Sequence, residues 1–176
     1  MFINLITDSL PALAISMEPS NPALIHDKPR SRDESVLNRP TMTAILAYGT
    51  LIAVAAVTAF LIGLGKVPFV SNMLPEVAYG PVCASTMAFA TTCLARLWHG
   101  FNMRGKEGIF KLKIQSNWWV VGAFVLGAIL LHAILRLSIF SAAFGTSLLS
   151  VHLLGIMWLL SFLPTLIIQI YKAVRY

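Results

Sequence analysis

The chain has 176 residues, of which 57% are hydrophobic and 11% are charged, and its mean hydropathy is +0.79. A soluble domain of this size carries about a quarter charged residues, so the composition excludes a water-facing globule and indicates a membrane protein. The net charge of +6 does not indicate a nucleic-acid partner, because the basic residues fall in short clusters between long apolar runs.

The first apolar segment, residues 2 to about 17, is short for a complete membrane span. It has no basic start and contains Asp8 and Pro11, so it does not fit a signal peptide. Residues 18–40 carry prolines and mixed charges, with too few apolar residues to build a domain. We expect them to form a cytoplasmic loop.

Four further apolar runs are long enough to cross a bilayer, which takes about 20 helical residues. They cover residues 41–64, 77–99, 117–135 and about 148–170, and the stretch SIFSAAFGTS before the last run predicts a turn and a helix start. The sequence therefore predicts an all-α polytopic membrane helical bundle with about five transmembrane helices. Its parts are a partial helix in residues 1–17, the loop 18–40 and a four-helix bundle in 41–176.

The distribution of basic residues predicts the orientation of these spans. Ten lie in segments on one side of the predicted membrane and two on the other. The larger group is Lys28, Arg30, Arg32, Arg39, Arg104, Lys106, Lys111, Lys113, Lys172 and Arg175; the smaller is Lys66 and Arg136. The positive-inside rule then predicts a cytoplasmic C-terminus, and we expect a multi-pass protein of the plasma membrane.

The first segment also carries the residues with the clearest chemistry. Asn4, Thr7 and Asp8 stand at i, i+3 and i+4, so on a helix their side chains share one face. They offer an amide oxygen, a hydroxyl and a carboxylate, the hard donors that Ca²⁺ prefers. Pro11 favours local unwinding, and an aspartate within the membrane is by default a functional residue. The alternative is that this is only the frayed polar start of a helix.

The segment FINLITDSLPALAISMEP resembles the sixth membrane helix of P2-type ATPases, in which an N-L-x-T-D-x-x-P-A pattern supplies cation ligands. The following HDKPRSRDE is similar to that family's next cytoplasmic loop, and the four later spans match helices seven to ten in hydropathy and spacing. The resemblance, which is greatest to bacterial calcium pumps, covers essentially the whole chain.

This resemblance implies that Asn4 and Asp8 coordinate the transported ion, Ca²⁺, and that Thr7 contributes to the first of two sites. In two-calcium pumps the eighth helix adds a carboxylate to that first site, but here Arg96 stands at or within one turn of its position. A guanidinium is permanently charged, so Arg96 would pair with Asp8, plug the vacant site and limit the pump to one ion per cycle. Alternatively, Arg96 extends to the cytoplasmic interface beside Trp98 and His99.

The sequence contains no D-K-T-G-T phosphorylation motif, no T-G-E-S motif and no glycine-rich phosphate loop. We therefore expect the chain alone to be inactive, with ATP and Mg²⁺ acting only in a complete pump. It begins at Met1 inside what should be a longer helix, as a truncated or split gene product would. Its expected partners are the lipid bilayer and the N-terminal remainder of a P-type ATPase. Alternatives are a non-enzymatic subunit that associates with a pump, and an unrelated small transporter coupling Asp8 to Arg96.

The remaining polar and small residues are expected to serve packing. We predict hydrogen bonds to neighbouring helices for His132 and His152, and close helix approach at Gly122 and Gly127. The two cysteines lack metal-type spacing and are expected to be packing residues. His26 and His99 are expected to be solvated at interfaces, and Trp118 and Trp119 to act as an interfacial anchor.

Overall fold

The computed structural model describes residues 7–19, 35, 37–105 and 117–175, and every regular element in these ranges is helical. The seven helices there are α1 (Ser9–Ser16), α2 (Arg39–Gly63), α3 (Pro68–Met73), α4 (Pro81–Asn102), α6 (Trp118–Arg136), α7 (Ser138–Phe144) and α8 (Val151–Arg175). Asn4 and His26 lie outside the described residues. The prediction of an all-α fold is confirmed.

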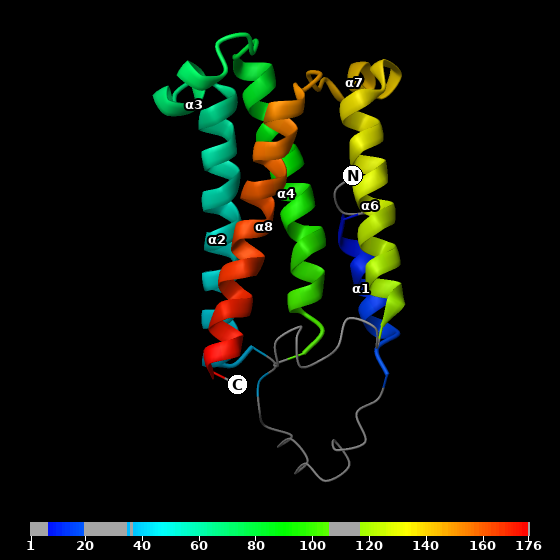
Figure 1. Ribbon diagram of the computed structural model, residues 1–176. Helices are drawn as coiled ribbons and strands as arrows, with labels where there is room; N and C mark the ends of the chain where they lie inside the picture. Colours follow the sequence, from blue (N-terminus) through cyan, green and yellow to red (C-terminus); the bar gives the residue numbers. More distant parts are fainter. Residues whose placement is uncertain (1–6, 20–34, 36, 106–116, 176) are drawn as a thin grey trace.

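Helix α4 forms the centre of an upright bundle (Figure 1), with α2 and α8 packed on one side and α1 and α6 on the other. Helices α2 and α6 run in one direction, and α1, α4 and α8 run in the other. The short helices α3 and α7 both lie at the end opposite the C-terminus, α3 beside the end of α2 and α7 beside the end of α6.

Three of the helices, α2, α6 and α8, are long and apolar enough to cross a membrane. Helix α4 has 22 residues but is more polar, since it contains Arg96 and several threonines. Its position explains this composition: its neighbours, rather than lipid, cover most of its side chains, and thirteen of its residues are buried. The three apolar helices confirm the membrane assignment, whereas the count of about five spans stays a prediction.

Local sequence signals set the helix ends. The Asn38 side chain accepts a hydrogen bond from the Thr41 amide at 2.9 Å and so caps α2; Asn117 caps α6 by accepting from the Trp119 amide at 3.0 Å. Gly145, with φ of 63°, ends α7 in the left-handed conformation that glycine adopts without strain. The stretch predicted to be a turn and the start of the last helix is therefore a separate helix, α7, and α8 begins at Val151.

The core lies along α4 and is built from large apolar side chains that are almost fully buried: Met87, Leu94, Leu97, Leu131, Leu135, Leu153, Met157 and Ile168. Cys83 and Cys93 are free thiols buried in the same core, as their packing role required. Glycines permit the closest helix contacts. A Cβ on Gly63 would lie 2.6 Å from the Cα of Ala84, and one on Gly127 would lie 2.7 Å from the Leu97 side chain. Gly122 has nothing within 4 Å of its Cβ position, so its predicted packing role is wrong.

The two histidines within the helices differ in environment. His132 contacts the Ala128 carbonyl through Nδ1 at 2.9 Å, and its Nε2 accepts a hydrogen bond from the Trp158 indole at 3.2 Å. The predicted bond to a neighbouring helix is therefore confirmed for His132. His152 is exposed on the outer face of α8, so the packed environment predicted for it is wrong.

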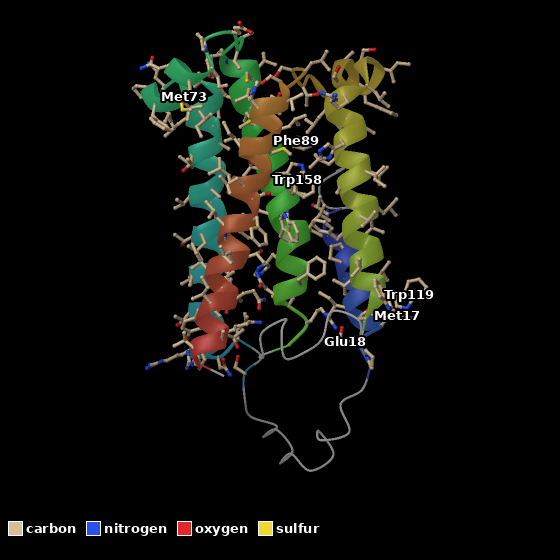
Figure 2. All side chains as sticks on the ribbon, in the orientation of Figure 1. Met17, Glu18, Met73, Phe89, Trp119 and Trp158 are labelled. Atoms are coloured by element: carbon tan, nitrogen blue, oxygen red, sulfur yellow. The ribbon has the colours of Figure 1, made fainter. Side chains whose placement is uncertain are left out.

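Aromatic side chains mark both the ends and the interior of the bundle. Trp118 and Trp119 are each 65% exposed at the start of α6, and Figure 2 shows Trp119 near Glu18 at the end opposite Met73. Trp98 lies inside, with its ring centroid 4.2 Å from that of Phe124, and is not the interfacial residue that one interpretation required.

Candidate cation site

The candidate site lies where α1 begins. Thr7 and Asp8 form a π-helical turn that leads into α1, and such turns are frequent at functional sites. Pro11 provides the cause, since it has no amide hydrogen to donate to the carbonyl of Thr7 four residues earlier and its ring crowds that carbonyl. The local distortion predicted from Pro11 is therefore present at the two described members of the polar face.

The carboxylate of Asp8 meets the guanidinium of Arg96 on α4. Nη2 of Arg96 donates to Oδ2 of Asp8 at 2.5 Å, across 88 positions of sequence. The side chains are 37% and 38% exposed, respectively, so the pair is open on one side of the bundle. Thr7, by contrast, is 2% exposed.

Close packing of two helices brings this pair together. Helices α1 and α4 run in the same direction (Figure 1), and a Cβ on Gly100 would lie 3.2 Å from the Cβ of Pro11. Because Asp8 precedes Pro11 by three residues and Arg96 precedes Gly100 by four, the contact places the two charges at the same height.

A polar clamp holds the other end of α1. Nη2 and Nε of Arg104 donate to the two carboxylate oxygens of Glu18 at 2.7 and 3.0 Å. The side-chain Nδ2 of Asn117 donates to the same carboxylate at 2.7 Å and to the Ala14 carbonyl at 2.9 Å. We call Glu18, Arg104 and Asn117 the α1 clamp. A bidentate pair of this kind is directional as well as strong, so it fixes the angle at which α1 approaches α4.

Sequence reasoning missed this clamp. It assigned Glu18 to the cytoplasmic loop and treated Arg104 only as a topological charge, yet the Arg104 side chain is 1% exposed. Neither residue belongs to a recognisable local pattern, since Glu18 and Arg104 are separated by 86 positions. No signal in the sequence identified them as partners.

A second polar network joins α4 to α8. Nζ of Lys172 donates to the carbonyls of Asn102 and Gly105 at 2.5 and 2.6 Å, and the Gln169 amide donates to Oδ1 of Asn102 at 2.5 Å. The Asn102 amide donates to Oγ1 of Thr165 at 3.2 Å. A cation at the end of α4 complements the negative pole of the helix dipole.

A sequence signal for this second network existed. Ser161, Thr165, Gln169 and Lys172 recur at helical spacing along an otherwise apolar helix, and all four are buried. From the sequence, Lys172 was interpreted only as one of the basic residues on the cytoplasmic side. His99 was expected to be solvated, but it is half-buried, 5.6 Å from the Tyr48 ring centroid and 3.3 Å from the Asn102 amide.

The donors at the head of α1 do not make a complete cation site. Ca²⁺ takes six to eight oxygen ligands, whereas Thr7 and Asp8 offer a hydroxyl and one carboxylate. Across the ranges that the structure describes, His, Cys, Asp and Glu residues form no group of three that could hold a metal ion. Thr7 and Asp8 could therefore contribute only some of the ligands of an ion, and the Asp8 carboxylate is paired with the Arg96 guanidinium.

The chain is similar to segments of known cation-transporting ATPases. The sequence profile of the family described as "Cation transporting ATPase, C-terminus" matches residues 1–174. The chain is 28% identical over 183 residues to Calcium-transporting ATPase 1 of Bacillus cereus, covering 99% of the chain and 20% of that relative. It is 36% identical over 124 residues to the Calcium-transporting ATPase of Bacillus subtilis, covering 70% of the chain and 13% of that relative. The chain thus spans a fifth or less of the length of these relatives.

Proposed function

Because the chain belongs to the family of cation-transporting ATPase C-termini, we propose that it is the membrane part of an ATP-driven calcium transporter. It is related to calcium-transporting ATPases over a segment that makes up 13–20% of their length. ATP hydrolysis, with its Mg²⁺, would then belong to the remainder of a pump, because this sequence contains no phosphorylation motif.

Asp8 is the residue on which the transport proposal depends. Thr7 and Asp8 lie in the π-helical turn, a feature frequent at functional sites. An aspartate at membrane depth costs at least about 2.5–3.5 kcal/mol to insert. A role in holding an ion accounts for that cost. Asn4, four residues before Asp8, would supply a third oxygen donor from the same helical face.

Arg96 is proposed to act as a built-in cation beside this site. It would neutralise Asp8 while no ion is bound, and its charge would take the place of a second Ca²⁺. The ion pair with Asp8 at 2.5 Å supports this proposal. The transporter would then move one ion per cycle. Arg96→Glu should raise the number of ions moved per ATP, and an unchanged number in that variant would contradict the plug.

The proposed topology has five spans, formed by α1 with its preceding residues and by α2, α4, α6 and α8. Arg39, Arg104, Lys172 and Arg175 lie at the bundle end that carries the C-terminus, and Lys66 and Arg136 lie at the other. By the positive-inside rule, the C-terminal end faces the cytoplasm in this proposed topology. The proposed location of the protein is the plasma membrane.

A chimeric pump tests the transport function directly. The C-terminal segment of the Bacillus cereus relative would be replaced with this chain, and ATP-driven uptake of radioactive Ca²⁺ would be measured in inverted membrane vesicles. We expect uptake that is abolished by Asp8→Asn. The matched control is Glu76→Gln, which removes an exposed carboxylate between α3 and α4 and should leave uptake unchanged.

Equal uptake by the chimera and its Asp8→Asn variant would refute the role of Asp8. If a folded chimera takes up no Ca²⁺, while the 176-residue chain copurifies with an intact pump, the non-enzymatic subunit would be the better interpretation. Ion flux through the purified chain without ATP would instead support an independent transporter.

A further inference from the structure

A groove opens at the C-terminal end of the bundle, away from the Asp8–Arg96 pair. It has a volume of about 880 Å³ and lies between the first half of α2, the end of α4 and the last turns of α8. Its walls are largely apolar and include Ala44, Ala47, Leu51, Ile167 and Ile168. Because α2 and α8 are both candidate membrane spans, we expect these walls to lie within one leaflet of the bilayer.

The groove is basic at one end. Arg39, Lys172 and Arg175 line it together with the apolar residues, and all three lie at the ends of their helices. On α2, Arg39 and Leu51 are twelve residues apart, which is about 18 Å along a helix axis. The hydrocarbon core of a bilayer is about 30 Å thick, so the groove has the length of one leaflet, with charge at its outer end.

Lys172 is the most informative of these residues. It is 6% exposed, and two of its three N–H donors bind the carbonyls at the end of α4. Neither Lys172 nor Arg39 pairs with a carboxylate of residues 7–19, 35, 37–105 or 117–175. Arg39 and Lys172 thus bring positive charge to the groove with no carboxylate partner among the described residues, and an anion is the complementary ligand.

We propose that this groove binds an anionic phospholipid of the leaflet at the C-terminal end of the bundle. The phosphate lies among Arg39, Lys172 and Arg175, and an acyl chain follows the apolar wall past Ala47 toward Leu51. One ligand of this chemistry satisfies both features of the groove, whereas a soluble anion would leave the apolar wall uncovered. The proposal requires only membrane insertion and is independent of the ion site.

Lipid retention by the purified 176-residue chain tests the proposal. The chain would be reconstituted in nanodiscs containing equal amounts of phosphatidylglycerol and phosphatidylcholine, released into detergent and weighed with its bound lipids by native mass spectrometry. We expect phosphatidylglycerol to be retained preferentially. Arg39→Gln should lower that preference about fivefold, since each basic residue near a membrane surface contributes about that factor.

A second variant tests the apolar wall. Ala47→Trp fills the groove without changing its charge, so it should reduce the retention of both lipids. Arg39 and Ala47 are exposed positions of α2, so Arg39→Gln and Ala47→Trp disturb no core contact. The matched controls are Arg136→Gln, an exposed arginine at the other end of the bundle, and Ala53→Trp, an exposed alanine of α2 outside the groove. Both controls should retain lipid as the wild type does.

Several results would overturn the proposal. Equal retention of the two lipids, or control variants that lose as much lipid as the groove variants, would show non-specific binding. Unchanged retention in Ala47→Trp would exclude the acyl chain from the groove. Complete displacement of phosphatidylglycerol by millimolar inorganic phosphate would reveal a simple anion site, and a lipid-free dimer would show that a second copy fills the groove.

Discussion

Replacing Arg96 by glutamine in the chimeric pump should increase the affinity for Ca²⁺. The substitution removes a positive charge and keeps a side chain of similar length on α4. A Ca²⁺ ion bound to Oδ2 of Asp8 lies about 2.4 Å from that oxygen, and Nη2 of Arg96 lies 2.5 Å from the same atom. The ion and the guanidinium nitrogen would then be at most about 5 Å apart if Arg96 kept its place.

The size of the effect follows from this distance. Charges of +2 and +1 that are about 5 Å apart repel by about 1.7 kcal/mol even at the dielectric constant of water, and by more at the lower values found inside proteins. A free energy of about 1.4 kcal/mol corresponds to a factor of ten. We therefore expect the Ca²⁺ concentration for half-maximal uptake to fall at least about fifteenfold in Arg96→Gln.

The assay is ATP-driven Ca²⁺ uptake in vesicles as a function of free Ca²⁺. Arg96→Lys, which keeps the charge, should remain close to the wild type, and Arg136→Gln controls for the loss of an arginine far from the site. A half-saturating concentration that changes by less than about threefold in Arg96→Gln would refute the reasoning, because it would mean that Arg96 does not face the bound ion.

Three further predictions concern the stability of the chain in mixed micelles, measured by thermal or denaturant unfolding. Gly63→Ala should destabilise the fold by about 1–3 kcal/mol, since its Cβ would lie 2.6 Å from the α4 backbone, whereas ordinary contacts begin at 3.4 Å. The control Gly49→Ala, whose Cβ would have nothing within 4 Å, should be neutral or stabilising. Equal effects of the two substitutions would contradict the close packing at Gly63. Glu18→Gln should cost about 3 kcal/mol because it removes the negative charge that pairs with the buried guanidinium of Arg104. A change below about 1 kcal/mol would mean that this pair is not formed. His132→Phe should cost about 1–3 kcal/mol by removing the acceptor of an indole N–H and should alter the near-ultraviolet dichroism of tryptophan, whereas an unchanged spectrum would contradict that bond.

Much of the helical organisation was predictable from the sequence. The predicted apolar runs 41–64 and 117–135 correspond closely to α2 (Arg39–Gly63) and α6 (Trp118–Arg136). Their boundaries are marked by Asn38 and Asn117, whose side chains cap the helices locally. The run 77–99 was placed four residues early at its start and three at its end, because Pro81 rather than the first apolar residue begins α4 (Pro81–Asn102). The polar face at Thr7 and Asp8 and its distortion by Pro11 were also evident locally.

The partners of the polar residues were much less predictable. The Asp8–Arg96 pair was anticipated only through the resemblance to P2-type ATPases, since the two residues are 88 positions apart. The α1 clamp was missed entirely, and Lys172 was counted only as a cytoplasmic charge although it is buried against α4. Periodicity indicates which residues share a face of one helix, but not which neighbouring helix that face meets.

The sequence by itself determined that this protein crosses a membrane as helices, because each backbone N–H and C=O in hydrocarbon must be satisfied within its own segment. Only the tertiary structure decided which charges meet. Close approach of helices at Gly63 and Gly100 sets the height and direction of each contact, and buried charges are tolerated only where that geometry provides partners. The ion pair at Asp8, the α1 clamp and the basic groove are all consequences of that packing.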